Sequence, residues 1–109
     1  MAIHKYILVN REIVECDDLL QWARWFEAAE RQVAVTMVGS SKILTVFLGL
    51  DHRFDGAGPP VLFESQVFGG AEDGEQERYT TWGEAVLGHR AMVDRVAGSK
   101  TEKDATDSQ

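Results

Sequence analysis

The chain has 109 residues, a formal net charge of −7 at pH 7 and a single cysteine, Cys16. This length fits one domain, and a lone cysteine excludes an internal disulfide and a cysteine-cluster metal site. The negative charge disfavours direct binding to nucleic acid or to an anionic membrane, because both carry charge of the same sign. It is compatible with a basic protein partner, including a nucleic-acid-binding protein whose cationic groove the chain blocks.

The N-terminal sequence lacks the charged segment and the apolar run of about 7–15 residues that mark a secretory signal. The longest apolar stretches also fall well short of the roughly 20 residues that cross a bilayer. We therefore expect a cytoplasmic protein.

The first predicted element is a β-hairpin over residues 6–14. Residues 6–9 and 13–14 are apolar and rich in β-branched side chains, which favours strands. Asn10 lies between the two runs, so we expect the chain to reverse there.

A helix is expected next, from an N-cap at Asp17 or Asp18 to about Gln32. Both aspartates place negative charge where the helix dipole favours it. No glycine or proline interrupts the segment, and apolar residues recur along it at helical spacing: Leu19, Trp22, Phe26, Ala29 and Val33. This spacing predicts a helix that buries one apolar face.

Three strands are predicted after this helix. Residues 33–38 and 43–50 flank a turn-rich tetrapeptide, and residues 61–68 form the third strand. The intervening residues 51–60 contain Asp-Gly, Gly-Pro and Pro-Pro pairs, which indicate a loop. The strand over 43–50 is apolar at both parities, which is typical of a central strand covered on both sides. Residues 69–76 are polar and acidic, so a solvated loop is expected there.

A second helix is predicted to begin at Thr81, because Thr81 and Glu84 match a capping box. Gly98 is expected to close it. Its apolar stripe comprises Trp82, Val86, His89, Val93 and Val96. Beyond Gly98 the sequence offers almost nothing to bury, which predicts a disordered tail over residues 98–109 and a folded domain over residues 1–97.

The predicted element order is therefore ββ-α-βββ-α. Short links between successive strands favour a mostly antiparallel sheet of about five strands, because parallel pairing needs a long crossover. Two helices with one apolar face each are expected to pack on that sheet. The result is a two-layer α+β sandwich.

Four segments carry a family resemblance: CDDLLQWARWFE at 16–27, TVFLGLDHRF at 45–54, PPVLFESQVFGG at 59–70 and ERYTTWGEAVLGH at 77–89. Together they resemble a family of small proteins encoded in phages, prophages and bacterial genomes. Gln66 and Gly83 depart from its pattern, which has an apolar and an acidic residue at these positions. The resemblance implies no catalytic residue. It implies a setting, namely an accessory protein of a mobile element, acting in the cytoplasm of a bacterial host.

Asp51, His52 and Asp55 are the leading candidates for chemistry, because they lie where a strand enters a loop rich in glycine and proline. His52 is a candidate general base, or a ligand for a divalent ion together with the two aspartates. Glu64 or His89 would be the additional group. The alternative is that Asp51 and His52 satisfy backbone groups of the turn. His89 by itself is expected to be half-buried, with one ring nitrogen satisfied.

Trp25 and Leu20 are candidates for a partner-binding surface. Trp22 and Trp82 lie on the apolar stripes and are expected in the core, whereas Trp25 lies off the stripe. An exposed tryptophan beside Leu20 would form a contact surface for a protein. The alternative is that Trp25 covers the rim of the core.

The sequence contains neither a Gly-x-Ser-x-Gly nucleophile motif nor a phosphate-binding P-loop. We therefore assign no catalytic residue, no metal and no cofactor. The pattern favours a non-enzymatic binding or protein-interaction module, whose partner is another protein or a second copy in a homodimer. Two alternatives stay open: a small-ligand or metal-dependent activity centred on Asp51 and His52, and a structural component of a phage particle.

Overall fold

The computed structural model describes residues 4–52 and 58–107, with side chains up to Gly98. In chain order the described elements are β1 (Tyr6–Val9), β2 (Glu12–Glu15), α1 (Leu19–Ala28), β3 (Gln32–Val38), β4 (Ser41–Phe47), β5 (Phe63–Phe68), β6 (Gln76–Tyr79) and α2 (Trp82–Asp107). The α+β class is confirmed, as is the predicted order of a strand pair, a helix, further strands and a second helix.

The described strands form two antiparallel sheets where the sequence pattern indicated one. β1 pairs with β2, while β3, β4, β5 and β6 form a four-stranded sheet in which each strand pairs with the next along the chain. β6 was not among the predicted strands. Its four residues carry no apolar alternation; it pairs antiparallel with β5, and Glu64 and Arg78 form an ion pair across the two strands.

The β1–β2 hairpin turns where the sequence predicts. Val9 faces Glu12 in the strand register, which leaves Asn10 and Arg11 as a two-residue turn. Both residues have positive φ angles, 52° and 69°. A two-residue turn with this backbone conformation matches the right-handed twist of the two strands that it joins. The predicted reversal at Asn10 is confirmed.

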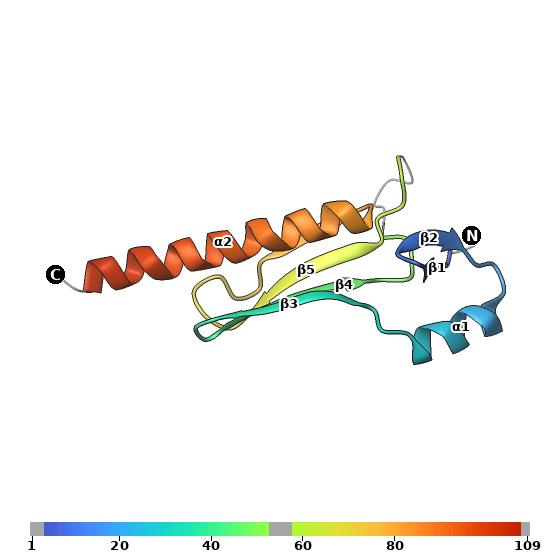
Figure 1. Cartoon of the computed structure of the whole chain (residues 1–109), viewed down its shortest axis with the longest axis horizontal. Coiled ribbons are helices and arrows are strands. Elements are labelled where there is room, and N and C mark those ends of the chain that lie inside the picture. Colours follow the sequence, from blue (N-terminus) through green and yellow to red (C-terminus); the bar gives the residue numbers. More distant parts are fainter. Residues whose placement is uncertain (1–3, 53–57, 108–109) are drawn as a thin grey trace.

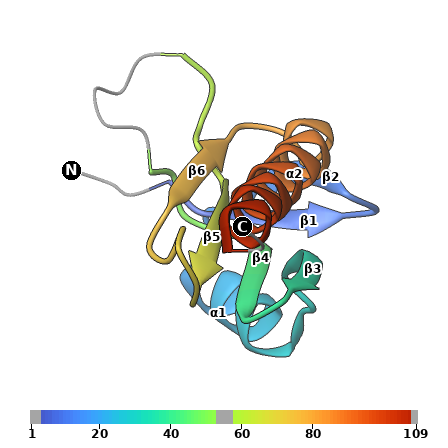
Figure 2. The same ribbon diagram turned by 90° about the vertical axis from the view of Figure 1, so that its left-hand side faces the viewer.

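α2 covers one face of the four-stranded sheet, and Figures 1 and 2 show it lying along the strands. Met92 and Val96 of the helix pack with Ile43 and Val67 of the sheet in one buried cluster. A second cluster joins the start of α2 to the sheet and to β1, and its members are Tyr6, Phe47, Leu62, Phe63 and Ala85. The core therefore lies between α2 and one side of the sheet.

α2 continues past Gly98, so the predicted helix end is wrong. The helical backbone runs through Asp107, and Figure 1 shows the last turns extending beyond the ends of the strands. Glycine costs a helix about 1 kcal/mol relative to alanine, which weakens a long helix without ending it. A helical backbone over residues 98–107 differs from the predicted disordered tail, while a domain boundary at residue 97 stays a prediction. Among the described residues, no helix is long and apolar enough to cross a membrane.

α1 lies beside the end of the four-stranded sheet, on the side opposite α2 (Figures 1 and 2). Asp18 is its N-cap, since the Asp18 carboxylate accepts the Gln21 N–H at 3.0 Å. Leu19, predicted on the buried stripe, is exposed instead. The helix is held to the rest of the fold through Trp22, whose indole N–H donates to the Tyr6 carbonyl at 3.0 Å, and through the Trp25 ring, which meets that of Phe47.

Candidate functional site: an uncovered sheet face

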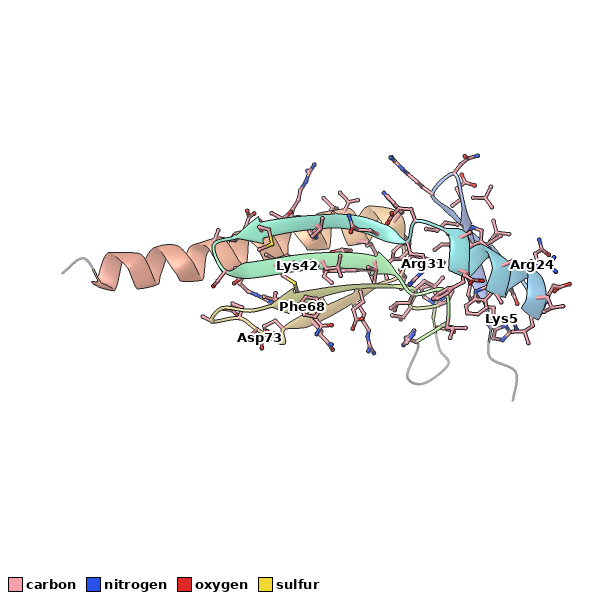
Figure 3. All side chains as sticks on the ribbon, turned by 90° about the horizontal axis from the view of Figure 1, so that it is seen from below. Lys5, Arg24, Arg31, Lys42, Phe68 and Asp73 are labelled. Carbon is pink, nitrogen blue, oxygen red and sulfur yellow. The ribbon has the colours of Figure 1, made fainter. Side chains whose placement is uncertain are left out.

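The four-stranded sheet has one face that neither described helix covers. Ile43, Thr45 and Phe47 of β4 are fully buried towards α2. Because successive side chains of a strand point to opposite faces, the alternate residues of β4 and of its neighbours point away from α2. We call this surface the open face; it comprises Val35, Met37, Lys42, Leu44, Val46, Glu64, Gln66 and Phe68. Figure 3 views the sheet from this side, with Lys42 and Phe68 labelled.

Exposed apolar side chains lie on two strands of the open face, β3 and β5, which flank β4. Val35 is 43% exposed, Met37 is 61% exposed and Phe68 is 42% exposed. The strand register places Met37 and Phe68 on either side of Lys42 in a single row, and it places Val35 beside the half-buried Leu44 in the next row. Contiguous exposed apolar surface of this kind marks interaction sites in soluble proteins.

Charged groups lie both between and beside the apolar side chains of the open face. Arg78 of β6 contacts Glu64 of β5, with 3.5 Å between Nε and Oε1. Lys42 lies near the β3–β4 turn and has no carboxylate partner among the described residues. Protein–protein interfaces combine apolar and polar side chains in this way.

The sequence pattern did not find this surface. The strand expected over residues 43–50 was interpreted as covered on both faces, and that interpretation is wrong, because Leu44 and Val46 face the uncovered side. A weak signal was present in the polar residues Lys42 and Gln66, which alternate with the buried ones. Glu64 lies on the open face. The sequence predicted it instead as an additional group for chemistry at Asp51 and His52.

Asp51 and His52 fasten the base of the 51–60 loop through a single residue of the next segment. The Val61 N–H donates to Asp51 Oδ1 at 3.0 Å, and the His52 N–H donates to the Val61 carbonyl at 2.9 Å. Both bonds are of the backbone-satisfying kind that the sequence analysis gave as the alternative to chemistry. The His52 side chain is exposed. The third member of the predicted cluster, Asp55, lies outside the described residues.

Glu64 and His89 do not converge on this loop or on each other. Glu64 lies on the open face, whereas His89 projects from α2 onto the opposite face of the sheet. No group of three or more histidine, cysteine, aspartate or glutamate side chains within residues 4–52 and 58–98 is arranged to hold a metal ion.

His89 is buried and has both ring nitrogens bonded, one more than the sequence analysis expected. Nε2 lies 2.8 Å from the Thr36 hydroxyl and Nδ1 lies 2.7 Å from the Thr45 hydroxyl. The Thr45 hydroxyl is also bonded to that of Ser65. Burial lowers the pKa of His89, because a charged imidazolium is poorly solvated between helix and sheet. The neutral His89 side chain and these three hydroxyls therefore form a polar network that links α2 to the strands β3, β4 and β5.

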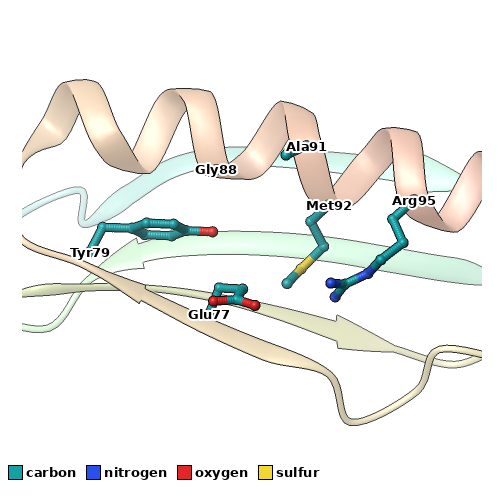
Figure 4. Close-up of a pocket in the computed structure, with 6 residues that line it drawn as sticks. All are labelled: Glu77, Tyr79, Gly88, Ala91, Met92 and Arg95. Carbon is teal, nitrogen blue, oxygen red and sulfur yellow. The ribbon is translucent and has the colours of Figure 1, made fainter.

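A small pocket opens between β6 and α2 (Figure 4). Its volume is about 260 Å³, and its lining residues are Glu77, Tyr79, Gly88, Ala91, Met92 and Arg95. The Tyr79 hydroxyl is buried and has no hydrogen-bond partner among the described residues. Burial raises the pKa of Tyr79; the Glu77 carboxylate adds to this effect and the Arg95 guanidinium opposes it.

Trp25 and Leu20 do not form the single surface that the sequence analysis proposed. Trp25 is half-buried and meets the Phe47 ring edge-on, with 5.7 Å between centroids, so it covers the rim of the core. Leu20 is exposed, as expected, and so is its neighbour Leu19. The exposed apolar surface of α1 is therefore made by two leucines without the tryptophan.

Comparison of the chain with protein families, with curated proteins and with solved structures finds no match.

Proposed function

We propose that this protein is a non-enzymatic interaction module that binds a protein partner on its open face. The observation that carries the proposal is the exposure of Val35, Met37 and Phe68 on a sheet whose other face is already sealed by α2. Leaving these side chains in water forgoes the free energy that burial of apolar area supplies. A partner surface recovers it.

The charge of the molecule and of the open face narrows the class of partner. A net charge of −7 opposes ligands that carry many phosphates and favours a partner of basic character. On the open face itself, Lys42 offers one positive group between apolar side chains, and Glu64 with Arg78 offers one neutralised pair beside them. A protein surface with its own mixture of apolar and polar groups fits this pattern.

The setting comes from the family resemblance in residues 16–89. It supports an accessory protein carried by a phage or prophage, acting on a host protein in the bacterial cytoplasm. A structural component of the phage particle is the rival within the same setting. It predicts that the chain sediments with purified virions, whereas an accessory module stays in the soluble fraction of the infected cell.

The test is to measure the affinity of one identified partner for variants of the open face. A partner that copurifies with the chain in stoichiometric amounts is titrated calorimetrically against the wild type and against Phe68→Ser and Leu87→Ser. Leu87 is the matched control, because it is a large exposed side chain on α2, away from the open face. We expect Phe68→Ser to weaken binding about tenfold or more and Leu87→Ser to leave it unchanged. Equal affinities for both variants would refute the open face as the binding surface.

A further inference from the structure

The two edges of the four-stranded sheet differ in length and in charge. β6 forms one edge with only four residues, of which Glu77 and Arg78 are charged. β3 forms the other with seven residues, Gln32–Val38, which include no charged residue and no proline. Short or charged edges resist pairing with a further strand, whereas long uncharged edges favour it. Figure 3 shows β3 as the outer strand on its side of the sheet.

The turn between β3 and β4 fixes which backbone groups of β3 point outward. Val38 faces Ser41 across a two-residue turn that begins with Gly39 at φ 59°, so Val38 and Ser41 form the hydrogen-bonded pair that closes the hairpin. Hydrogen-bonded and non-bonded pairs alternate along antiparallel strands. The N–H and C=O groups of Val35 and Met37 therefore point away from β4. Among the described residues none bonds to them outside the strand pairing.

We propose that two copies of this chain pair along β3 in an antiparallel dimer whose twofold axis passes through Thr36. In this register Val35 lies opposite the partner's Met37, and Met37 lies opposite the partner's Val35. Four N–H···O=C bonds then use every outward-pointing group of these two residues. The two four-stranded sheets become one continuous sheet.

The register also matches the two faces of the sheet. Directly opposed residues of paired strands share a face, so Val35 of one copy packs beside the partner's Met37 on the joined open face, and both α2 helices lie on the other side. These are two of the most exposed apolar side chains of the sheet. Pairing shields them in part and doubles the width of the open face.

A second copy fits this edge better than an unrelated strand for reasons of charge and symmetry. Two molecules of net charge −7 repel each other over most of their surfaces. Gln32–Val38 contains no charged residue, so two copies can meet along it without placing like charges opposite each other. A twofold contact is self-complementary and closes after two copies. The charged β6 edge then remains as the outer edge of the dimer.

The first experiment compares dimer dissociation for two variants by sedimentation equilibrium of the full chain. Val35→Glu places two carboxylates near the twofold axis. Val14→Glu adds the same charge to β2 at a residue that is 42% exposed, against 43% for Val35. We expect a wild-type dimer, with the dissociation constant raised about tenfold or more by Val35→Glu and unchanged by Val14→Glu. A strictly monomeric wild type, or equal weakening by both variants, would overturn the proposal.

A second experiment tests the register. The Cα atoms of directly opposed, non-hydrogen-bonded residues lie about 4.5 Å apart, within the range of about 4.4–6.8 Å that a disulfide spans. Thr36→Cys should therefore form a covalent dimer on mild oxidation, and Val14→Cys should not. Circular dichroism checks that the Thr36 variant is folded, since Thr36 also bonds to His89. Cross-linking no faster than in the Val14 variant would overturn the register.

Pairing along the β3 edge and partner binding on the open face can be refuted independently of each other. Phe68 lies on β5, two strands from the β3 edge, so Phe68→Ser should weaken partner binding and preserve the dimer. A dimer that Phe68→Ser dissociates would instead be held face to face, and pairing along β3 would be refuted.

Discussion

The two faces of the four-stranded sheet are made from alternate residues of the same strands, yet only one is sealed. Ile43, Thr45 and Phe47 are fully buried beneath α2, while their neighbours Leu44 and Val46 are only half-buried on the open face. Both sets are mostly apolar, so composition does not separate them. What separates them is the helix, because within the described residues only α2 is long enough to cover the sheet, and it lies on one side (Figure 1).

A strand with apolar residues at both parities therefore does not need two covers within its own chain. Buried parallel strands show this pattern because helices lie on both faces. Here the second cover is supplied from outside the chain, if the open face binds a partner as proposed.

The largest effect is expected from removing the same number of atoms on the two faces. Ile43→Ala should lower the free energy of unfolding by about 2–5 kcal/mol, because it leaves a cavity in the cluster under α2. Leu44→Ala, at the adjacent and half-buried position, should cost about 1 kcal/mol. Denaturant unfolding at a fixed protein concentration measures both. Equal losses would mean that the open face is as well packed as the covered one.

The contact of α2 with the sheet is expected to be intolerant of one added methyl group at Gly88. A Cβ atom there would overlap the Tyr79 ring, so Gly88→Ala should destabilise the fold by about 1–3 kcal/mol. Gly98→Ala is the matched control, since a Cβ atom at Gly98 meets nothing within 4 Å. There alanine should stabilise the helix by up to about 1 kcal/mol. Thermal unfolding distinguishes the two signs, and a neutral Gly88→Ala would contradict the close packing.

The covered face should make stability dependent on pH through His89. Its pKa is lowered from an ordinary value of 6.5, so the unfolded chain binds the proton more readily than the folded chain. The stabilisation is fully present above about pH 6.5 and declines as the pH falls towards the lower folded-state pKa. The free energy of unfolding of His89→Gln should show a shallower slope just below pH 6.5 than that of the wild type. Identical slopes would show that His89 is not held neutral.

The smallest effect is expected at the Asp51–His52 loop. If these residues only fasten the loop to Val61, divalent metals and nucleotides should leave the thermal midpoint unchanged, because only a ligand that binds the folded state raises it. The same screen on His52→Ala is the control. A rise in the wild type that His52→Ala abolishes would establish the small-ligand activity in place of this interpretation.

Features fixed by local chemistry could be predicted from the sequence. The reversal at Asn10, the N-cap at Asp18 and the cap of α2 all depend on residues a few positions apart. At the last of these, the Glu84 N–H donates to the Thr81 hydroxyl at 3.0 Å. The Glu84 carboxylate accepts from Thr80, one residue earlier than a capping box predicts, and these bonds lower the pKa of Glu84.

Features that depend on what lies across the fold could not be predicted. Leu19 has the spacing of a buried residue, but α1 meets the core through Trp22, Trp25 and Phe26, so Leu19 stays in water. β6 is a strand because β5 offers it a partner, and its own residues carry no strand pattern. The open face carries alternating apolar residues as the covered face does, and its polar residues Lys42 and Gln66 are only a weak sign of exposure, so the position of α2 is what separates the two faces clearly (Figure 1).

The most direct test of the account compares two methionines, one on each face of the sheet. Met37 lies exposed on the open face, whereas Met92 is buried between α2 and the covered face. Dilute hydrogen peroxide oxidises accessible methionines to the sulfoxide, and mass spectrometry follows each site. We expect rapid oxidation of Met37, slow oxidation of Met92, and protection of Met37 once the partner is bound. Equal oxidation rates in the chain alone, or a Met37 that the bound partner leaves unprotected, would contradict this expectation.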